Sequence, residues 1–245
     1  MALKAFSGGA VFADVTGTGS PRVLALHGWG RSSADFREVL SGMGAVAVDL
    51  PGFGNSPPPS SGWGSAEYAD AIRDVGSAFE EPPVVVAHSF GGRVAVHLAE
   101  EMTMRSLVLI GVPLVRPGNA DRPAPAFRVA RRLHRLGVLS DERMEGFRQK
   151  YGSADYRATN GVMREVFVRV VNETYDDQLD RLAIPVRMLW GANDSAAPLS
   201  QAQIAYRRLA DRGADVELRV LEGVGHHVMA ERPQDVTQLI KELLA

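Results

Sequence analysis

The chain has 245 residues, of which 45% are hydrophobic and 23% charged, and its formal net charge is −2. These values exclude an intrinsically disordered chain, which would be poorer in apolar residues and less balanced in charge. They also give no basic surface for nucleic-acid binding. The absence of cysteine excludes disulfides and thiolate metal sites.

No segment has the pattern of a secretory leader or of a membrane span. The N-terminal residues lack a basic segment followed by an apolar run. The longest apolar stretches, residues 84–87 and 106–112, are far shorter than the ~18 residues that a transmembrane helix needs. We therefore expect a cytoplasmic protein with neither a nucleic-acid nor a membrane partner.

Short apolar runs predict the strands of one sheet. The first two, 3–6 and 10–15, alternate weakly around Ser7-Gly8-Gly9 and predict a hairpin. The later runs are rich in β-branched residues and do not alternate, which is typical of parallel strands covered on both faces. They span residues 22–27, 44–50, 83–88, 105–111, 185–190 and 216–221.

Stretches with helical spacing of apolar residues alternate with these strands. The first, 33–40, opens with Ser-Ser-Ala-Asp, a suitable N-cap. The others span residues 66–79, 90–101, 199–209 and 234–244. Such alternation predicts an α/β fold with a mostly parallel, doubly wound sheet. We expect residues 1–112 and 181–245 to form this core.

Residues 113–180 interrupt the alternation. They contain no convincing strand, and arginine-rich helical segments are predicted at residues 126–136, 141–151 and 162–173. Because open α/β sheets bind ligands at the carboxyl ends of their strands, this insertion predicts a helical lid over that edge.

Three residues at strand ends have the types that nucleophilic catalysis requires. Ser89 lies in Ala-His-Ser-Phe-Gly-Gly between a strand and a helix, which is the pattern of a nucleophile elbow with Ala87 in place of the usual first glycine. Asp194 and His226 each follow a later strand, and the order Ser, Asp, His is the one that a catalytic triad on this fold needs. Each residue alone also has an ordinary interpretation, as a turn serine, a surface aspartate or a loop histidine.

Several motifs resemble those of the α/β-hydrolase superfamily. They are His27-Gly28-Trp29-Gly30, the loop DLPGFGNS at residues 49–56, GAND around Asp194, and GHHVMAERP from Gly225. The resemblance covers nearly the whole chain outside the insertion, and it favours His226 over His227 as the base because Glu231 and Pro233 follow in the family's register. It implies an oxyanion hole made by the backbone N–H groups of Trp29 and Phe90, and it implies no cofactor and no metal ion.

Within the superfamily, the pair HGWG and DLPGFG is similar to the esterases that cleave pimeloyl-acyl-carrier-protein methyl ester. The elbow residues 91–95 resemble small-lid hydrolases such as the menaquinone-pathway enzyme. Ser89 stands where haloalkane dehalogenases and soluble epoxide hydrolases carry aspartate, which disfavours their chemistry. His88 stands where many meta-cleavage hydrolases carry asparagine, which weakens that interpretation.

The predicted function is a serine hydrolase that cleaves a carboxylic ester, thioester or lactone of a small acyl substrate through an acyl-enzyme on Ser89. The alternatives are carbon–carbon bond hydrolysis by the same triad and ligand binding on a hydrolase scaffold. The residues expected to line the substrate pocket are Trp29, Phe127, Leu133, Leu136, Phe147 and Met163.

The insertion is unusually basic. Residues 116–150 contain nine basic and four acidic side chains. This excess predicts either a dock for an anionic substrate or an acidic carrier protein, or a solvated face whose arginine stems cover apolar surface.

Overall fold

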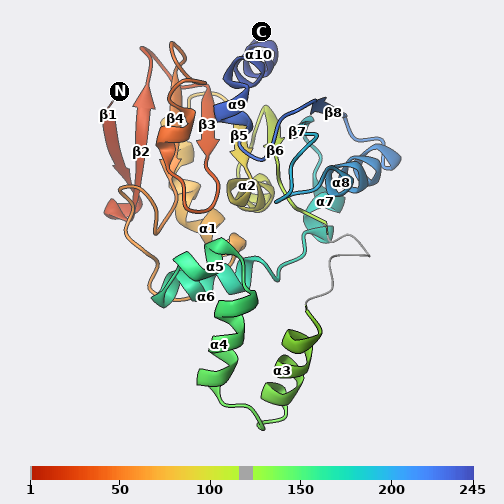
Figure 1. The fold of residues 1–245 in the computed structure, drawn as a ribbon. Coiled ribbons are helices and arrows are strands. Elements are labelled where there is room, and N and C mark those ends of the chain that lie inside the picture. The colour runs from red at the N-terminus through yellow and green to blue at the C-terminus, as the bar shows by residue number, and fades with distance from the viewer. Residues whose placement is uncertain (1, 116–123) are drawn as a thin grey trace.

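The eight predicted strands form one sheet in the computed structural model, which describes residues 2–115 and 124–245. The strand order is β1-β2-β4-β3-β5-β6-β7-β8, which places β1 and β8 at the two edges (Figure 1). β1 (Ala2–Phe6) and β2 (Val11–Thr16) form the predicted antiparallel hairpin, and β2 pairs antiparallel with β4 (Ala45–Asp49).

The remaining strands pair in parallel, so the prediction of a mostly parallel, doubly wound sheet is confirmed. The central strands are buried throughout, because runs that are almost entirely aliphatic can be covered on both faces. The parallel strands beside β4 are β3 (Val23–Leu26), β5 (Val84–His88), β6 (Ser106–Ile110), β7 (Val186–Gly191) and β8 (Val216–Leu221).

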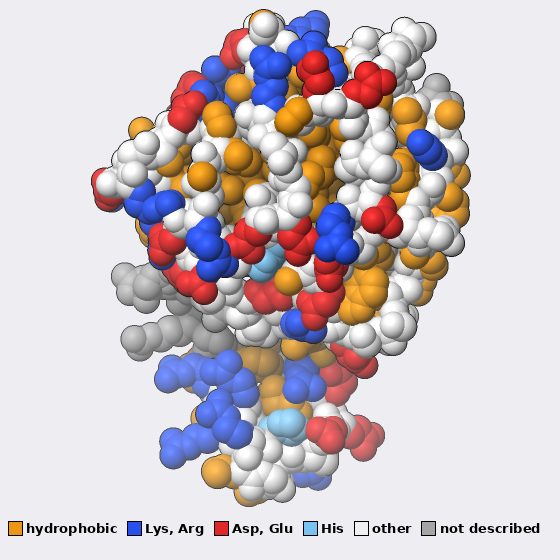
Figure 2. All heavy atoms as spheres, turned by 180° about the vertical axis from the view of Figure 1, so that it is seen from behind, with side chains coloured by type: hydrophobic (Ala, Val, Ile, Leu, Met, Phe, Trp, Pro, Cys, Tyr) orange, Lys and Arg blue, Asp and Glu red, His pale blue; other side chains and the backbone are white. Residues whose placement is uncertain are grey.

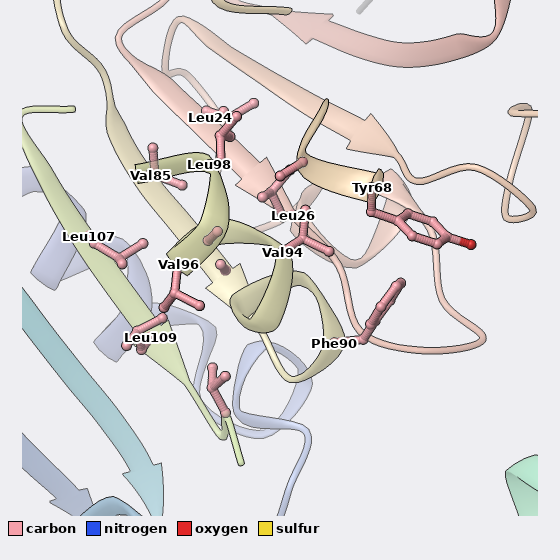
Figure 3. Close-up of a cluster of buried hydrophobic side chains, with 14 of the residues drawn as sticks. Leu24, Leu26, Tyr68, Val85, Phe90, Val94, Val96, Leu98, Leu107 and Leu109 are labelled. Carbon is pink, nitrogen blue, oxygen red and sulfur yellow. The ribbon is translucent and has the colours of Figure 1, made fainter. Parts of the chain in front are cut away.

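Alternate residues of the central strands supply two separate cores. Leu24 and Leu26 point to one face of the sheet, where they pack with Val94 and Leu98 of α2 (Figure 3). Val23 and Ala25 point to the other face. The first face is covered by α1 (Ser65–Ile72), α2 (Phe90–Glu101), α7 (Asp176–Arg181) and α8 (Leu199–Asp211), and the second mainly by α9 (Val228–Glu231) and α10 (Pro233–Leu244).

Two predicted helices are shorter than their apolar spacing suggested. The prediction of an α-helix at 33–40 is wrong. A 3₁₀ turn covers only Ser33–Phe36, and the Ser32 side chain caps it. Phe36, Val39 and Leu40 are nevertheless buried, and such spacing also suits consecutive tight turns. The stretch 66–79 forms α1 and then continues as a 3₁₀ segment, Arg73–Ala78.

The insertion contains helices and, among its described residues 113–115 and 124–180, no strand. α3 and α4 form a helical hairpin (the α3–α4 hairpin, residues 125–151) that projects from the body of the molecule (Figure 1). α6 instead contacts the loops after β3 and β4, through Phe167 against Trp29 and Met163 against Gly52. α7 instead packs between α2 and α8. The bounds are α3 (Pro125–Arg135), α4 (Asp141–Tyr151), α5 (Ala154–Ala158) and α6 (Gly161–Val170).

The division into a core of residues 1–112 and 181–245 and a lid of residues 113–180 remains a prediction. No helix in residues 2–115 and 124–245 has both the length and the apolar character that crossing a bilayer requires.

Candidate active site

Ser89 lies on the sharp turn between β5 and α2. Its φ of 47° and ψ of −110° place it in a region that non-glycine residues rarely adopt. The N–H of Ser89 donates to the carbonyl of Ile110 at 2.9 Å, which fixes the turn against the neighbouring strand. This is the strained backbone geometry of a nucleophile elbow.

Gly91 allows that turn to lie close to the loop after β3. A Cβ at this position would be 2.7 Å from the carbonyl oxygen of His27, and the Gly91 N–H donates to the same oxygen at 3.0 Å. A side chain would therefore push α2 away from the loop that carries Trp29.

Asp194 and His226 form a hydrogen-bonded pair. His226 Nδ1 and Asp194 Oδ2 are 2.7 Å apart, and the aspartate side chain is fully buried. The other carboxylate oxygen, Oδ1, accepts from the N–H groups of Ala196 at 2.9 Å and Ala197 at 2.7 Å. Both oxygens of Asp194 are thus engaged, so the carboxylate can hold the imidazole in one orientation.

The pair and Ser89 both border the carboxyl end of β6, because Ser89 bonds to Ile110 and the pair lies against Gly111. Gly111 has a φ of +56°, and a Cβ there would lie 3.1 Å from Asp194 Oδ2 and 3.2 Å from His226 Nδ1. Glycine therefore satisfies both the backbone conformation and the lack of space. Across the described residues, no hydrogen bond joins the Ser89 hydroxyl to His226.

His88 supports the loop that carries His226. Its Nε2 lies 2.9 Å from the carbonyl oxygen of His226, and because a carbonyl only accepts, this nitrogen bears the proton. Burial, with a smaller contribution from the His226 ring 4.8 Å away, lowers the pKa of His88 to about 3. The side chain is therefore neutral near pH 7.

His27 and Asp49 hold the two loops beside Ser89. His27 Nδ1 donates to the Gly28 carbonyl at 2.7 Å, and Nε2 accepts from the N–H of Leu50 at 3.0 Å; burial lowers the pKa of His27 to about 4. Asp49 is buried, but N–H groups of Asn55 and Ser33 bond to its carboxylate and keep its pKa below the ordinary value. Neither side chain is a partner of His226.

The backbone N–H groups of Trp29 and Phe90 have no hydrogen-bond acceptor among the residues that the structure describes. Phe90 is the first residue of α2, where N–H groups lack a partner within the helix. Trp29 lies in the loop after β3, which Gly91 brings close to the same turn. Two unpaired donors beside Ser89 are suited to bind a developing oxyanion.

Aromatic side chains cover this part of the site, and we call Trp29, Phe53, Phe90 and Phe167 the aromatic wall. The Trp29 ring centroid lies 5.0 Å from Phe53, 5.3 Å from Phe90 and 5.0 Å from Phe167, in edge-to-face arrangements. Phe90 also contacts Tyr68 of α1 at 5.0 Å (Figure 3). Two loops and two helices thus converge on one apolar surface.

Only part of the predicted pocket lies near this wall. Met163 of α6 packs against Gly52, and Trp29 belongs to the wall itself. The expectation that α3 and α4 supply the wall is wrong, because both helices project away from the sheet (Figure 1). The four residues concerned are Phe127 and Phe147, whose rings contact Tyr151, and Leu133 and Leu136, which are 37% and 67% exposed.

Sequence reasoning missed Phe53 and Phe167. Phe53 belongs to the DLPGFG loop, and Phe167 follows Met163 by four residues, one helical turn along the same face of α6. That spacing was the available signal for Phe167.

α6 is held firmly on the core. Val166 and Val170 are buried, and Arg93 Nη1 donates to the Val170 carbonyl at 2.7 Å. Beyond α6, the Glu173 carboxylate accepts from the Ser65 hydroxyl at 2.7 Å and from Tyr175 at 2.9 Å. The helix that carries Phe167 therefore has a fixed position over Trp29.

Comparisons with known proteins agree with this fold. The model of the alpha/beta hydrolase family matches residues 23–239. The soluble epoxide hydrolase of Corynebacterium sp. (strain C12) is 26% identical, covering 90% of this chain and 88% of that protein. The pimeloyl-[acyl-carrier protein] methyl ester esterase of Aromatoleum aromaticum is 26% identical, covering 91% of this chain and 98% of that protein.

Solved structures show the same architecture. The esterase RhEst1 from Rhodococcus sp. ECU1013 matches with a TM-score of 0.70 and 25% identity, covering 100% of this chain and 99% of that one. A meta-cleavage product hydrolase from Pseudomonas fluorescens IP01 matches with a TM-score of 0.66 and 20% identity, covering 96% and 93%.

The match of the family model over most of the sequence shows that this chain belongs to the alpha/beta hydrolase family. The chain is a hydrolase, and the resemblance found in its motifs is confirmed.

Proposed function

We propose that this hydrolase cleaves a carboxylic ester, thioester or lactone through an acyl-enzyme on Ser89. The observation that carries the proposal is the 2.7 Å contact between His226 and the buried Asp194, at the sheet edge where Ser89 sits on its strained turn. Serine, histidine and aspartate in this relation are the parts of an acyl-transfer site.

In the first half-reaction, Ser89 Oγ attacks the substrate carbonyl carbon while His226 Nε2 accepts the serine proton. Asp194 fixes the imidazole tautomer and stabilises the imidazolium. The oxygen anion is bound by the N–H groups of Trp29 and Phe90, each of which is worth about 3–4 kcal/mol in such sites. His226 then protonates the leaving alcohol or thiol, and the carbon–oxygen or carbon–sulfur bond breaks.

In the second half-reaction, His226 removes a proton from water, which attacks the acyl-enzyme. The acid leaves, and the serine recovers its proton. A Ser89–His226 hydrogen bond is not required before substrate binds, because such contacts are often long in free enzymes and shorten in the substrate complex.

The aromatic wall beside Ser89 favours a substrate whose acyl group is apolar. Trp29, Phe53 and Phe167 are only partly buried, so a chain bound beside Ser89 can cover them. Each methylene buried there contributes about 0.8 kcal/mol. We expect medium-chain esters to be cleaved more efficiently than acetate esters.

Three alternative functions can be distinguished from ester hydrolysis. Epoxide hydrolysis in the family uses an aspartate nucleophile, and this chain has Ser89. Carbon–carbon hydrolysis by the same triad predicts turnover of a vinylogous diketone and poor turnover of simple esters. A ligand-binding protein on this scaffold predicts no covalent reaction with a serine-directed probe. Docking of an acidic carrier protein on the insertion remains a prediction, and it enters the experiment described below.

The test is labelling with a fluorophosphonate and turnover of p-nitrophenyl esters of increasing chain length. We expect one label, on Ser89, and a loss of 10⁴-fold or more in kcat, on the order seen for triad residues, in Ser89→Ala and His226→Ala. His227→Ala is the matched control and should retain activity. Full activity in His226→Ala with loss in His227→Ala would show that the base is misassigned, and an unlabelled, fully active Ser89→Ala would refute the proposal.

A further inference from the structure

The α3–α4 hairpin exposes a stripe of aliphatic side chains. Val129, Leu133 and Leu136 lie on one face of α3, since residues three and four apart are neighbours on a helix. They are 58%, 37% and 67% exposed, and Val138, at the turn after α3, is 71% exposed. Among the described residues, most exposed large hydrophobic side chains lie in the insertion, and a cluster of this kind marks an interaction site.

A row of arginines borders the stripe. The row consists of Arg128, Arg131, Arg132 and Arg135, and helical spacing places it on the face of α3 next to Leu136. All four are exposed, and within the described part of the chain none forms an ion pair or a side-chain hydrogen bond. Elsewhere many arginines are paired, as Arg208 is with Asp180 at 2.6 Å.

The third face of α3 is occupied by α4. Ala130 is buried, Phe127 contacts the Tyr151 ring at 6.2 Å, and His134 Nε2 lies 2.7 Å from Asp141 Oδ1. The stripe and the arginine row are therefore the two faces of α3 that the protein itself leaves uncovered.

The charge of the hairpin opposes that of the whole chain. Residues 125–151 contain seven basic and three acidic side chains, whereas the formal net charge of the protein is −2. Figure 2 shows Lys and Arg side chains gathered on the projecting part of the molecule, with hydrophobic side chains at its far end. The predicted excess also counted Arg116, Asp121 and Arg122, which lie outside the described residues.

We infer that the α3–α4 hairpin binds the surface of an anionic lipid membrane. The aliphatic stripe would enter the boundary between headgroups and acyl chains, and the guanidinium groups would remain at the level of the lipid phosphates. Each basic side chain near an anionic leaflet raises the partition coefficient of the protein onto the membrane about fivefold. This inference goes beyond the proposed hydrolysis, and it replaces the expectation of no membrane partner with contact at the surface.

Two other occupants fit less well. A second copy bound through the same stripe would bring two arginine rows together, and like charges at an interface are unfavourable. A protein partner is usually bound through aromatic anchors at the centre of a patch, whereas Val129, Leu133, Leu136 and Val138 are aliphatic. An apolar stripe beside unpaired arginines matches an interfacial helix in both respects.

The test is cosedimentation of the full chain with vesicles of phosphatidylcholine alone or mixed with phosphatidylglycerol, at low and at physiological salt. We expect binding only to the mixed vesicles, and weaker binding at the higher salt. Arg131→Gln with Arg132→Gln should weaken it roughly 25-fold. Leu136→Ser with Val138→Ser should weaken it roughly tenfold or more.

The matched control lies on α8, where Ile204 is 41% exposed and Arg207 is exposed and unpaired within the described residues. Ile204→Ser with Arg207→Gln should leave vesicle binding unchanged. Ser89→Ala should also bind like the wild type, which separates this inference from the proposed chemistry.

The inference is overturned if the wild type stays in solution with the mixed vesicles, or if the α8 control loses as much binding as the hairpin variants. Saturable binding to an acidic acyl carrier protein without any vesicle binding would overturn it in favour of a protein dock.

Discussion

Ser89 combines a proposed catalytic role with an unfavourable backbone conformation. Its φ of 47° costs on the order of 1–3 kcal/mol for a residue with a Cβ, and the cost is offset by the packing of β5 and α2 around the turn. The same conformation is accessible to glycine without that penalty.

We therefore expect Ser89→Gly to have a higher free energy of unfolding than Ser89→Ala, by about 1 kcal/mol, although both lack the nucleophile. Urea unfolding followed by circular dichroism measures the difference. The matched control is Ser77, an exposed residue outside the elbow, at which glycine should not be more stable than alanine. Equal stability of the two Ser89 variants would mean that the turn is relaxed.

Two buried histidines make stability depend on pH. Burial lowers the pKa of His27 to about 4 and that of His88 to about 3, from an ordinary value of 6.5. Between 6.5 and the lowered pKa of each histidine, the unfolded chain binds a proton at that histidine and the folded chain does not. The free energy of unfolding therefore falls as the pH falls through this range. Each histidine contributes about 1.4 kcal/mol per pH unit below 6.5.

The free energy of unfolding should thus decrease steadily from pH 7 to pH 5, as measured by urea unfolding at a series of pH values. His88→Gln should reduce the slope. His227→Gln, which removes an exposed histidine, should leave it unchanged. A constant stability over this range would contradict the assignment of both histidines as neutral.

Among the elements, the strands were predicted closely because a Gly or Pro residue lies within two residues of at least one end of each aliphatic run. α4 has the predicted bounds, residues 141–151, because Ser140 caps its first turn and Gly152 follows its last residue. The failure at 33–40 has a physical cause, since apolar residues three and four apart are buried equally well by 3₁₀ turns.

The candidate site also has a part that the sequence predicts and a part that it does not. Strand ends place Ser89, Asp194 and His226, so their order along the chain was informative. The aromatic wall was not predictable from amphipathic patterns alone. Such a pattern identifies the apolar face of a helix and not the surface that this face contacts. α3 turns part of that face to α4 and part to solvent, whereas α6 turns Phe167 to Trp29.

The fixed position of α6 makes Phe167 the residue expected to limit acyl length. Phe167→Ala should open space beside Trp29 and raise the ratio of kcat/KM for longer over shorter esters, about fourfold for each methylene accommodated. Val168→Ala, at a neighbouring residue that is 42% exposed, is the control and should leave the ratio unchanged. An unchanged ratio in Phe167→Ala would place the acyl group elsewhere.

For the molecule as a whole, β8 is an open edge of the sheet, with one side of its backbone unpaired. Its residues Val216, Leu218, Val220 and Leu221 are aliphatic, and Val220 is 36% exposed. Between them lie Glu217 and Arg219, which bond to each other at 2.7 Å, and Arg219 reaches Glu242 of α10 at 2.8 Å.

We expect those two charges to protect the protein from aggregation. An exposed edge strand without charged residues is a template on which a strand of another molecule can pair, and charged side chains on the edge prevent such pairing. Exposed ion pairs add only about 0–1 kcal/mol to stability, so Glu217→Val with Arg219→Val should barely change the free energy of unfolding. The double variant should nevertheless form growing assemblies, visible by light scattering, at concentrations where the wild type and the α8 control Arg207→Val do not. A variant that scatters no more than the wild type would show that the edge is protected by its geometry and not by its charges.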